Sequence, residues 1–461
     1  MPELSSTQSA LSDERRNALA HLLGVTPDAA LAAIGDLSRA LPGAKAADLE
    51  EMVAAEHLSR RRRTRAMGVL APLCRERTDG VEALTFPAAV LPRLWAEASS
   101  RDPDLLPLLD ETGDRSEAVA ERLCQRAAAI VRDQPDLVWP PDDAPDRAER
   151  LEALAAVLDL SRLARRLAPT LKAWTARPDE TEVLQLRATL REAGDIAPEG
   201  GVRLIDVVFA HMADAWLILR VVVQTSSVAG GEALLRGSDM GVFVERLITA
   251  LEARLGRLGA FAPEPDADFE VFRADLAWCS ATLTEISATL DLHPKSPWGA
   301  RVRNARAAAG VRLSRRLRTV DKTLARAFPD RRIHVVGMVT RDTPRLDIDL
   351  KGREVRQAEA ACAFLAALRG PAALLGCEAE RLKAAESAVD RLFDRADQSV
   401  DAIHGGDLEV EPGPGDARSR AAHARAVIGR MADLLEALDA DQAARTVRRR
   451  IATSARSQPP I

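Results

Sequence analysis

Cationic side chains are the most concentrated source of chemistry in this sequence. Between Lys295 and Arg332 there are twelve Lys or Arg residues and two acidic ones, a net charge of +10. The whole chain carries 64 basic and 69 acidic residues, so the remainder holds 52 basic and 67 acidic residues, a net charge of −15. Such a polarised distribution predicts a cationic surface that attracts an anionic partner.

Helical spacing separates these cations from an apolar stripe. Ser296 followed by Pro297 is typical of a helix start, because the hydroxyl caps free N–H groups and proline suits the first helical position. At about 100° per residue, one side of the helix holds Leu313, Leu317, Val320, Leu324 and Phe328. The opposite side holds the six candidate binding residues, Arg301, Arg312, Arg315, Arg318, Lys322 and Arg326.

Three kinds of anionic partner fit a cationic helix: nucleic-acid phosphates, lipid headgroups and an acidic protein. Nucleic acid is an alternative with less support, because only Trp298 and Phe328 are present to stack on bases. An anionic membrane surface is weaker still, since the apolar stripe has the spacing that suits a neighbouring helix. We therefore expect a protein partner, with equal weight on a solvated Arg-rich face that pairs with acidic helices of its own fold.

Candidate catalytic residues are sparse. His211 and Asp214 lie three residues apart, which places them on one side of a helix, with Arg220 further along. A shared metal would need matching acidic ligands from other helices, and the sequence has no second motif of that kind. The sequence thus predicts no catalytic residue, metal site or cofactor, and an enzyme built on His211, Asp214 and Arg220 is kept as an alternative.

The longest apolar run, 204–224, could cross a membrane or lie in a protein core. Its length of about 20 residues is just sufficient for a bilayer. It contains Asp206, His211, Asp214 and Arg220, and each central Asp or Arg adds about 2.5–3.5 kcal/mol to the free energy of insertion. We therefore expect a buried helix at 204–224.

The composition favours a mostly α protein, a multi-helix array. Hydrophobic residues make up 47% of the 461 residues, whereas aromatics make up 3% and Tyr is absent, a mixture better suited to packed helices than to sheets. The five cysteines form no close pair, which predicts reduced and mostly buried thiols. The sequence begins without an apolar leader, so we expect a cytoplasmic protein.

Proline-rich segments divide the chain. The predicted parts are an N-terminal helical unit at 1–133, a Pro-rich linker at 134–145, a helical unit at 146–262 and a C-terminal bundle at 266–461. Within the last part, apolar residues recur at spacings of four and three, which predicts an antiparallel coiled-coil-like bundle of long helices.

Two short segments interrupt the C-terminal bundle. Alternating apolar residues between 333 and 350 predict a small β-hairpin. The Gly- and Pro-rich stretch 404–416 predicts a flexible loop.

Taken together, these features predict a non-enzymatic adaptor, scaffold or regulatory subunit that binds an acidic macromolecule through its basic helix. The partner stays unidentified, and the helices with coiled-coil spacing leave a homo-oligomer open as an alternative.

Overall fold

The protein is described from a computed structural model, in which the main chain divides into two compact units. The described residues are 11–41, 43–141, 145–167, 180–226, 231–329, 332–336, 339–343, 345, 348–404 and 417–456. Unit 1 comprises 1–229 and 233–246, and unit 2 comprises 230–232 and 247–461. The boundary between the two units lies inside helix α13 (Gly241–Ala260).

The fold class is mostly α, as the composition predicted. Helices account for nearly all regular structure among the described residues, and the two strands are short. None of the helices in the described ranges combines the length and the hydropathy needed to cross a bilayer.

Unit 1 is built from short and medium-length helices, with 3-10 helices between some of them. Its elements are α1 (Asp13–Val25), α2 (Asp28–Ala40), α3 (Ala44–Met67), η1 (Gly68–Cys74), α4 (Val90–Arg101), η2 (Pro103–Asp110), α5 (Asp114–Asp133), α6 (Pro135–Val138), α7 (Arg147–Asp159), α8 (Ser161–Leu167), α9 (Glu180–Ile196), α10 (Gly200–His211), η4 (Ala215–Leu217) and α11 (Ile218–Thr225). Helix α12 (Glu232–Arg236) begins in unit 2 and continues in unit 1.

The core of unit 1 forms where α5 packs against α7. Helix α5 is amphipathic and buries Leu123, Ala127 and Val131 on its inner side. The Pro-rich segment between the two helices contributes Trp139, which is buried and lies under the guanidinium of Arg150 at 5.0 Å from its ring centroid. The two helices are therefore packed together across this segment, and a domain boundary at 134–145 stays a prediction.

The prediction of one continuous helix at 204–224 is wrong, although many residues of the two helices found there, α10 and α11, are buried. Helix α10 ends at His211, and the chain resumes helical geometry only at η4 and α11. Arg77 donates hydrogen bonds to the carbonyl oxygens of Phe209 at 2.6 Å and Met212 at 3.0 Å. Because Arg77 satisfies carbonyl groups that end a helix unpaired, α10 can stop inside the core.

Unit 2 contains several long helices. With the second part of α13, its elements are α14 (Phe269–Thr289), α15 (Pro297–Leu317), α16 (Val320–Ala327), β1 (Arg332–Val336), β2 (Val339–Thr343), α17 (Arg353–Ala367), α18 (Ala372–Leu375), α19 (Glu378–His404), α20 (Ala417–Ala437) and α21 (Asp441–Arg456).

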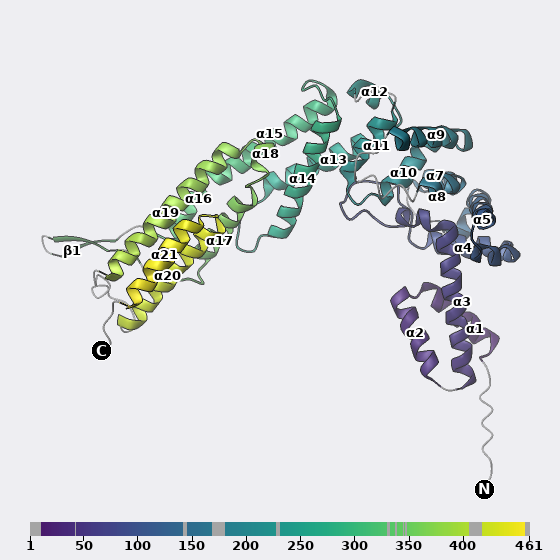
Figure 1. Ribbon diagram of the computed structural model, residues 1–461, viewed down its shortest axis with the longest axis horizontal. Helices are drawn as coiled ribbons and strands as arrows, with labels where there is room; N and C mark the ends of the chain where they lie inside the picture. The colour runs from purple at the N-terminus through teal and green to yellow at the C-terminus, as the bar shows by residue number, and fades with distance from the viewer. Residues whose placement is uncertain are drawn as a thin grey trace, which may run out of the picture. The chain divides into compact units, whose positions relative to one another are not determined.

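Helices α19, α20 and α21 pack against one another, and Figure 1 shows them side by side. Their facing sides bury Leu392 and Val400 of α19 together with Val427 and Met431 of α20. Helix α17 contacts both α16 and α20, and α16 also contacts α19. The basic helices α15 and α16 thus pack in part against helices that follow them in sequence, α17, α18 and α19.

The segment between α16 and α17 differs from the predicted hairpin. Strand β1 pairs antiparallel with β2, with Val336 opposite Val339 and Arg332 opposite Thr343. The predicted second strand through Leu350 is wrong, because Ile348 and the residues after it lie outside any strand. Ile348 is instead buried, and its carbonyl oxygen lies 2.9 Å from the ring Nε2 of His423 on α20.

The flexible loop predicted at 404–416 lies almost wholly outside the described residues. His404 itself is the last residue of α19.

Candidate anion-binding surface of helices α15 and α16

The start of α15 is held by side chains from two parts of unit 2. Ser296 accepts a hydrogen bond from the N–H of Gly299 at 3.3 Å, and Pro297 occupies the first helical position, as the sequence predicted. Glu232, only 5% exposed, accepts the N–H of Trp298 at 2.7 Å and the hydroxyl of Ser296. A carboxylate at this end also suits the positive pole of the helix dipole. These contacts fix where α15 begins.

The predicted apolar stripe is confirmed, because Leu313, Leu317, Val320, Leu324 and Phe328 are all buried. This stripe sets the direction of every cationic side chain along the two helices, since its burial leaves the opposite side in solvent.

The predicted single helix is wrong in one respect, because it is interrupted at Arg318 and Thr319. The hydroxyl of Thr319 donates to the carbonyl of Arg316 at 2.7 Å, and the N–H of Thr319 donates to the same oxygen at 2.9 Å. Such local side-chain bonding competes with the regular helical pattern and ends α15 there.

Gly310 allows α15 to approach α18 closely. A Cβ atom at this position would lie 2.3 Å from the carbonyl oxygen of Leu375, far inside van der Waals contact. After Leu375, Gly376 adopts a φ of +71°, a left-handed conformation that favours glycine, and α19 begins two residues later. The two glycines therefore place the start of α19 beside the cationic part of α15.

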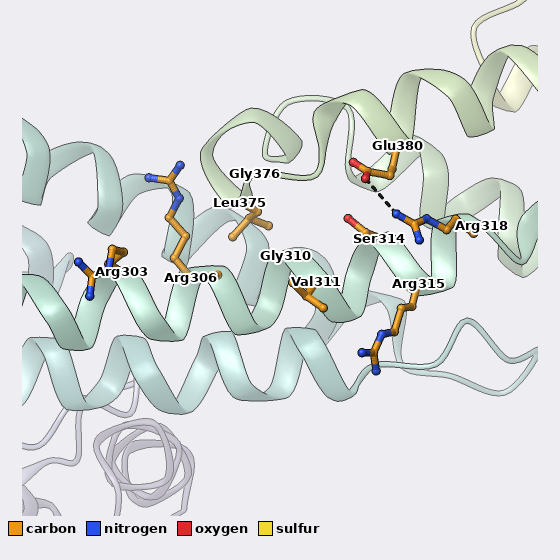
Figure 2. A pocket seen from close by; sticks show the side chains of 11 residues that line it. Arg303, Arg306, Gly310, Val311, Ser314, Arg315, Arg318, Leu375, Gly376 and Glu380 are labelled. Carbon is orange, nitrogen blue, oxygen red and sulfur yellow. Dashed lines mark hydrogen bonds and ion pairs between the residues drawn. The ribbon is translucent and has the colours of Figure 1, made fainter. Parts of the chain in front are cut away.

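A groove of about 640 Å³ lies between α15 and the α18–α19 connection. Its lining residues are Arg303, Arg306, Ala307, Gly310, Val311, Ser314, Arg315, Arg318, Leu375, Gly376 and Glu380. Figure 2 shows Arg306 and Arg318 on the side of α15 that faces α18 and α19, whereas Arg315 points to the other side of the helix. Four arginines and one glutamate give the groove a strongly positive character.

One ion pair crosses this groove. A guanidinium nitrogen of Arg318 lies 3.3 Å from Oε1 of Glu380, and the side chains are 70% and 33% exposed. The pair is drawn as a dashed line in Figure 2. An exposed pair of this kind contributes only about 0.2–1 kcal/mol, so it opens readily in water.

A second ion pair lies further along, between α16 and α19. Asp321 accepts from Nε of Arg391 at 2.7 Å and from the hydroxyl of Ser387 at 3.1 Å. The hydrogen bond from Arg391 is the main cause that lowers the pKa of Asp321, and the Ser387 hydroxyl acts in the same direction. This carboxylate is therefore charged at neutral pH and ties α16 to α19.

The six predicted binding residues do not act alike. Arg301 is committed within unit 2, because it donates to both carboxylate oxygens of Glu252, at 3.0 and 2.7 Å. Arg301 therefore differs from the other five predicted residues, since a partner would have to displace a bidentate pair.

The other five predicted residues are exposed: Arg312, Arg315, Arg318, Lys322 and Arg326. Arg315 and Arg318 line the groove described above. Arg326 instead lines a separate groove of about 410 Å³ that also contains Glu264 and Glu354. The structure therefore brings two of the six together at one site.

Sequence reasoning missed three charged residues of the groove, Arg303, Arg306 and Glu380. Arg306 precedes Leu313 by two helical turns, so helical spacing assigns it to the buried side of the helix. It is nevertheless exposed, because α15 is buried at Trp298 and Gly299 and again from Ala309, but the turn between these two parts is uncovered. The charge density between Lys295 and Arg332 was the one available signal for it.

The alternative catalytic site of His211, Asp214 and Arg220 is not formed on one helix, because α10 ends at His211. The ring Nε2 of His211 lies 2.7 Å from the carbonyl oxygen of Val69. Asp214 lies beyond the helix end, just before η4, so the predicted spacing of three residues on one helical side is lost. Among the described residues, no group of three or more His, Cys, Asp or Glu side chains is placed to hold a metal ion.

The cysteines are placed as predicted, mostly buried: Cys124, Cys279, Cys362 and Cys377 are buried and Cys74 is partly so. Burial raises the pKa of Cys74 to about 11 and that of Cys362 to about 12. These thiols are therefore protonated at neutral pH and are poor nucleophiles.

Comparison with known proteins supplies no relative for this chain, since no family model, no curated protein and no solved structure matches it.

Proposed function

We propose that this protein is a helical adaptor, scaffold or regulatory subunit that binds an acidic protein partner through the exposed cations of α15 and α16. The observation that carries the proposal is that the fold commits few of these cations internally. Within the part of the chain that the structure describes, Arg312, Arg315 and Lys322 are exposed and form no ion pair.

The alternative to partner binding is an Arg-rich face that pairs with acidic helices of its own fold. Had that face been paired with acidic helices of its own fold, these side chains would contact carboxylates, as Arg301 does with Glu252. A cationic surface that stays open attracts anionic partners over about 10 Å at moderate ionic strength. The remaining net charge of −15 outside 295–332 also disfavours general adhesion to polyanions.

The finer architecture belongs to the same proposal. We propose that α19, α20 and α21 form the antiparallel coiled-coil-like bundle predicted from the apolar spacing and that the short hairpin of β1 and β2 projects from it. The bundle would serve as a rigid support that presents α15 and α16 to a partner. We also propose that the protein is cytoplasmic and that it can form a homo-oligomer.

The test is partner capture from a native lysate of the source cells, using the full chain as bait. In the test variant, Arg312, Arg315 and Lys322 are all changed to Glu, which reverses the charge of the open surface. We expect the test variant to lose one defined protein partner that the unaltered chain retains after nuclease treatment. Raising the salt concentration should weaken capture by the unaltered chain as well.

A matched control changes the same net charge elsewhere. Arg93, Arg115 and Arg122 are exposed on α4 and α5 of unit 1, and none of them forms an ion pair among the described residues. Changing all three to Glu should leave partner capture intact. If both variants lost the partner equally, the loss would be due to net charge and not to the surface of α15 and α16. Recovery of nucleic acid alone would support the nucleic-acid alternative instead.

A further inference from the structure

The groove between α15 and the α18–α19 connection combines charge with apolar surface. Arg303, Arg306 and Arg318 supply the charge. Val311, 54% exposed, and the exposed Ala307 supply apolar surface within the same groove. A bare inorganic anion would leave the apolar part in water, so the groove suits a ligand that carries acidic and apolar side chains together.

A neighbouring groove extends this surface along α19. It has a volume of about 480 Å³ and is lined in part by Leu317, Ala379 and Ala384. Arg318 and Glu380 line both grooves, so the two are adjacent. An elongated ligand fits this arrangement better than a compact one. Neither groove is lined by an aromatic side chain, which disfavours stacking of nucleic-acid bases.

Glu380 lies where the two grooves meet, and its Oε1 forms an ion pair with Arg318 at 3.3 Å. A carboxylate from a ligand would compete with Glu380 for the same guanidinium, and Glu380 would repel it at close range. Because the pair is exposed and weak, such a ligand can displace it. In the free protein, Glu380 therefore acts as an internal competitor for the site.

We propose that this composite groove binds an extended or helical acidic segment of the partner protein, whose carboxylates contact Arg306 and Arg318 and displace Glu380 from Arg318. This inference rests on the proposed function and deepens it, because it names the chemistry of the partner segment and a residue that limits its affinity.

The test measures direct binding by fluorescence anisotropy with the full-length protein. The probe is a short fluorescein-labelled peptide composed of Glu and Leu, and the control peptide carries Lys in place of each Glu. Arg306→Gln should weaken binding of the acidic peptide by about two- to fivefold, since one exposed ion pair is lost. Glu380→Gln should strengthen binding by about the same factor, because the competing carboxylate is removed.

The gain in affinity with Glu380→Gln separates the inference from general damage to the fold, since a destabilised protein would lose affinity. Arg306→Lys keeps the charge and should retain most of the binding. Unchanged or weaker binding by Glu380→Gln, or equal affinity for the Lys-containing peptide, would overturn the inference. Tighter binding of a labelled single-stranded DNA with the same dependence on Arg306 would overturn it too, in favour of a nucleic-acid site.

The two proposals can fail separately. If reversing Arg312, Arg315 and Lys322 abolishes capture of the partner while Glu380→Gln leaves peptide affinity unchanged, the proposed function stands and the groove inference is wrong. If the peptide responds to both groove variants but no protein partner is captured, the groove binds acidic chains and the adaptor function is wrong.

Discussion

Replacing Glu232 with Ala removes both hydrogen bonds that this side chain accepts at the start of α15. The buried N–H of Trp298 would lose its 2.7 Å hydrogen bond to Glu232, and the hydroxyl of Ser296 would keep only the carbonyl oxygen of His293 as acceptor. A buried donor that loses its acceptor costs about 1–3 kcal/mol, and the cap from Ser296 to the N–H of Gly299 remains. We therefore expect unit 2 to be destabilised by about 1–3 kcal/mol.

The assay is hydrogen–deuterium exchange of the full chain, with attention to the peptide that begins at Pro297. Exchange at the first turn of α15 should become faster in Glu232→Ala, since the local opening free energy falls with the lost contacts. Glu232→Gln keeps an acceptor oxygen and should show an intermediate effect. Denaturant titration of the same variants provides the change in free energy of unfolding.

A matched control is Glu270→Ala on α14, whose side chain is 87% exposed and pairs only with Arg273 three residues away. This change should alter the free energy of unfolding by less than about 0.5 kcal/mol. Equal exchange at the start of α15 in Glu232→Ala and Glu270→Ala would refute the reasoning, because it would mean that Glu232 does not hold α15.

Two further predictions concern the helices next to the groove. Gly310→Ala should destabilise unit 2 by about 1–3 kcal/mol in denaturant titration, because its Cβ would meet the carbonyl oxygen of Leu375 at 2.3 Å. A Cβ atom at Gly256 would meet no atom within 4 Å, so Gly256→Ala should instead stabilise the protein by about 0.5–1 kcal/mol. Equal destabilisation by both substitutions would contradict the close contact between Gly310 and Leu375. Asp321→Asn should cost about 0.5–1 kcal/mol at neutral pH, a small amount because the Asp321 carboxylate is 40% exposed. Since the hydrogen bond from Arg391 lowers the pKa of Asp321 below 3.8, its stabilisation is present above that pH and is lost as the pH falls through the lowered pKa. The difference between Asp321→Asn and the unaltered protein should therefore shrink below about pH 4, and a difference that grows in acid would exclude this account.

The sequence by itself determined the helical class and the orientation of the basic helices. Leu313, Leu317 and Leu324 recur at helical spacing, so burying them against any neighbour sends the intervening cations towards solvent. The helix start at Ser296 and Pro297 was equally local, because it depends on residues within one turn. Such features follow from spacing and need no knowledge of distant partners.

Only the tertiary structure decided which cations remain open and where they gather. Arg301 was assigned to the binding surface, yet its Nε and one terminal nitrogen donate to Glu252, far away in sequence. Arg306 was omitted because its spacing matches that of Leu313, and it is exposed because the turn of α15 just before Ala309 is uncovered. Periodicity assigns a residue to a side of its own helix, but it does not say how far a neighbouring helix extends along that side.

The same limit applies to the ends of helices and to ion pairs across the fold. The helix predicted at 204–224 stops at His211 because Arg77 reaches its last carbonyl groups, and Arg318 meets Glu380 because two glycines place α19 beside α15. Each of these contacts joins residues more than fifty positions apart. Helical periodicity is a local property of the chain, whereas the pairing of charges and the capping of helices depend on which distant segments packing brings within about 3 Å.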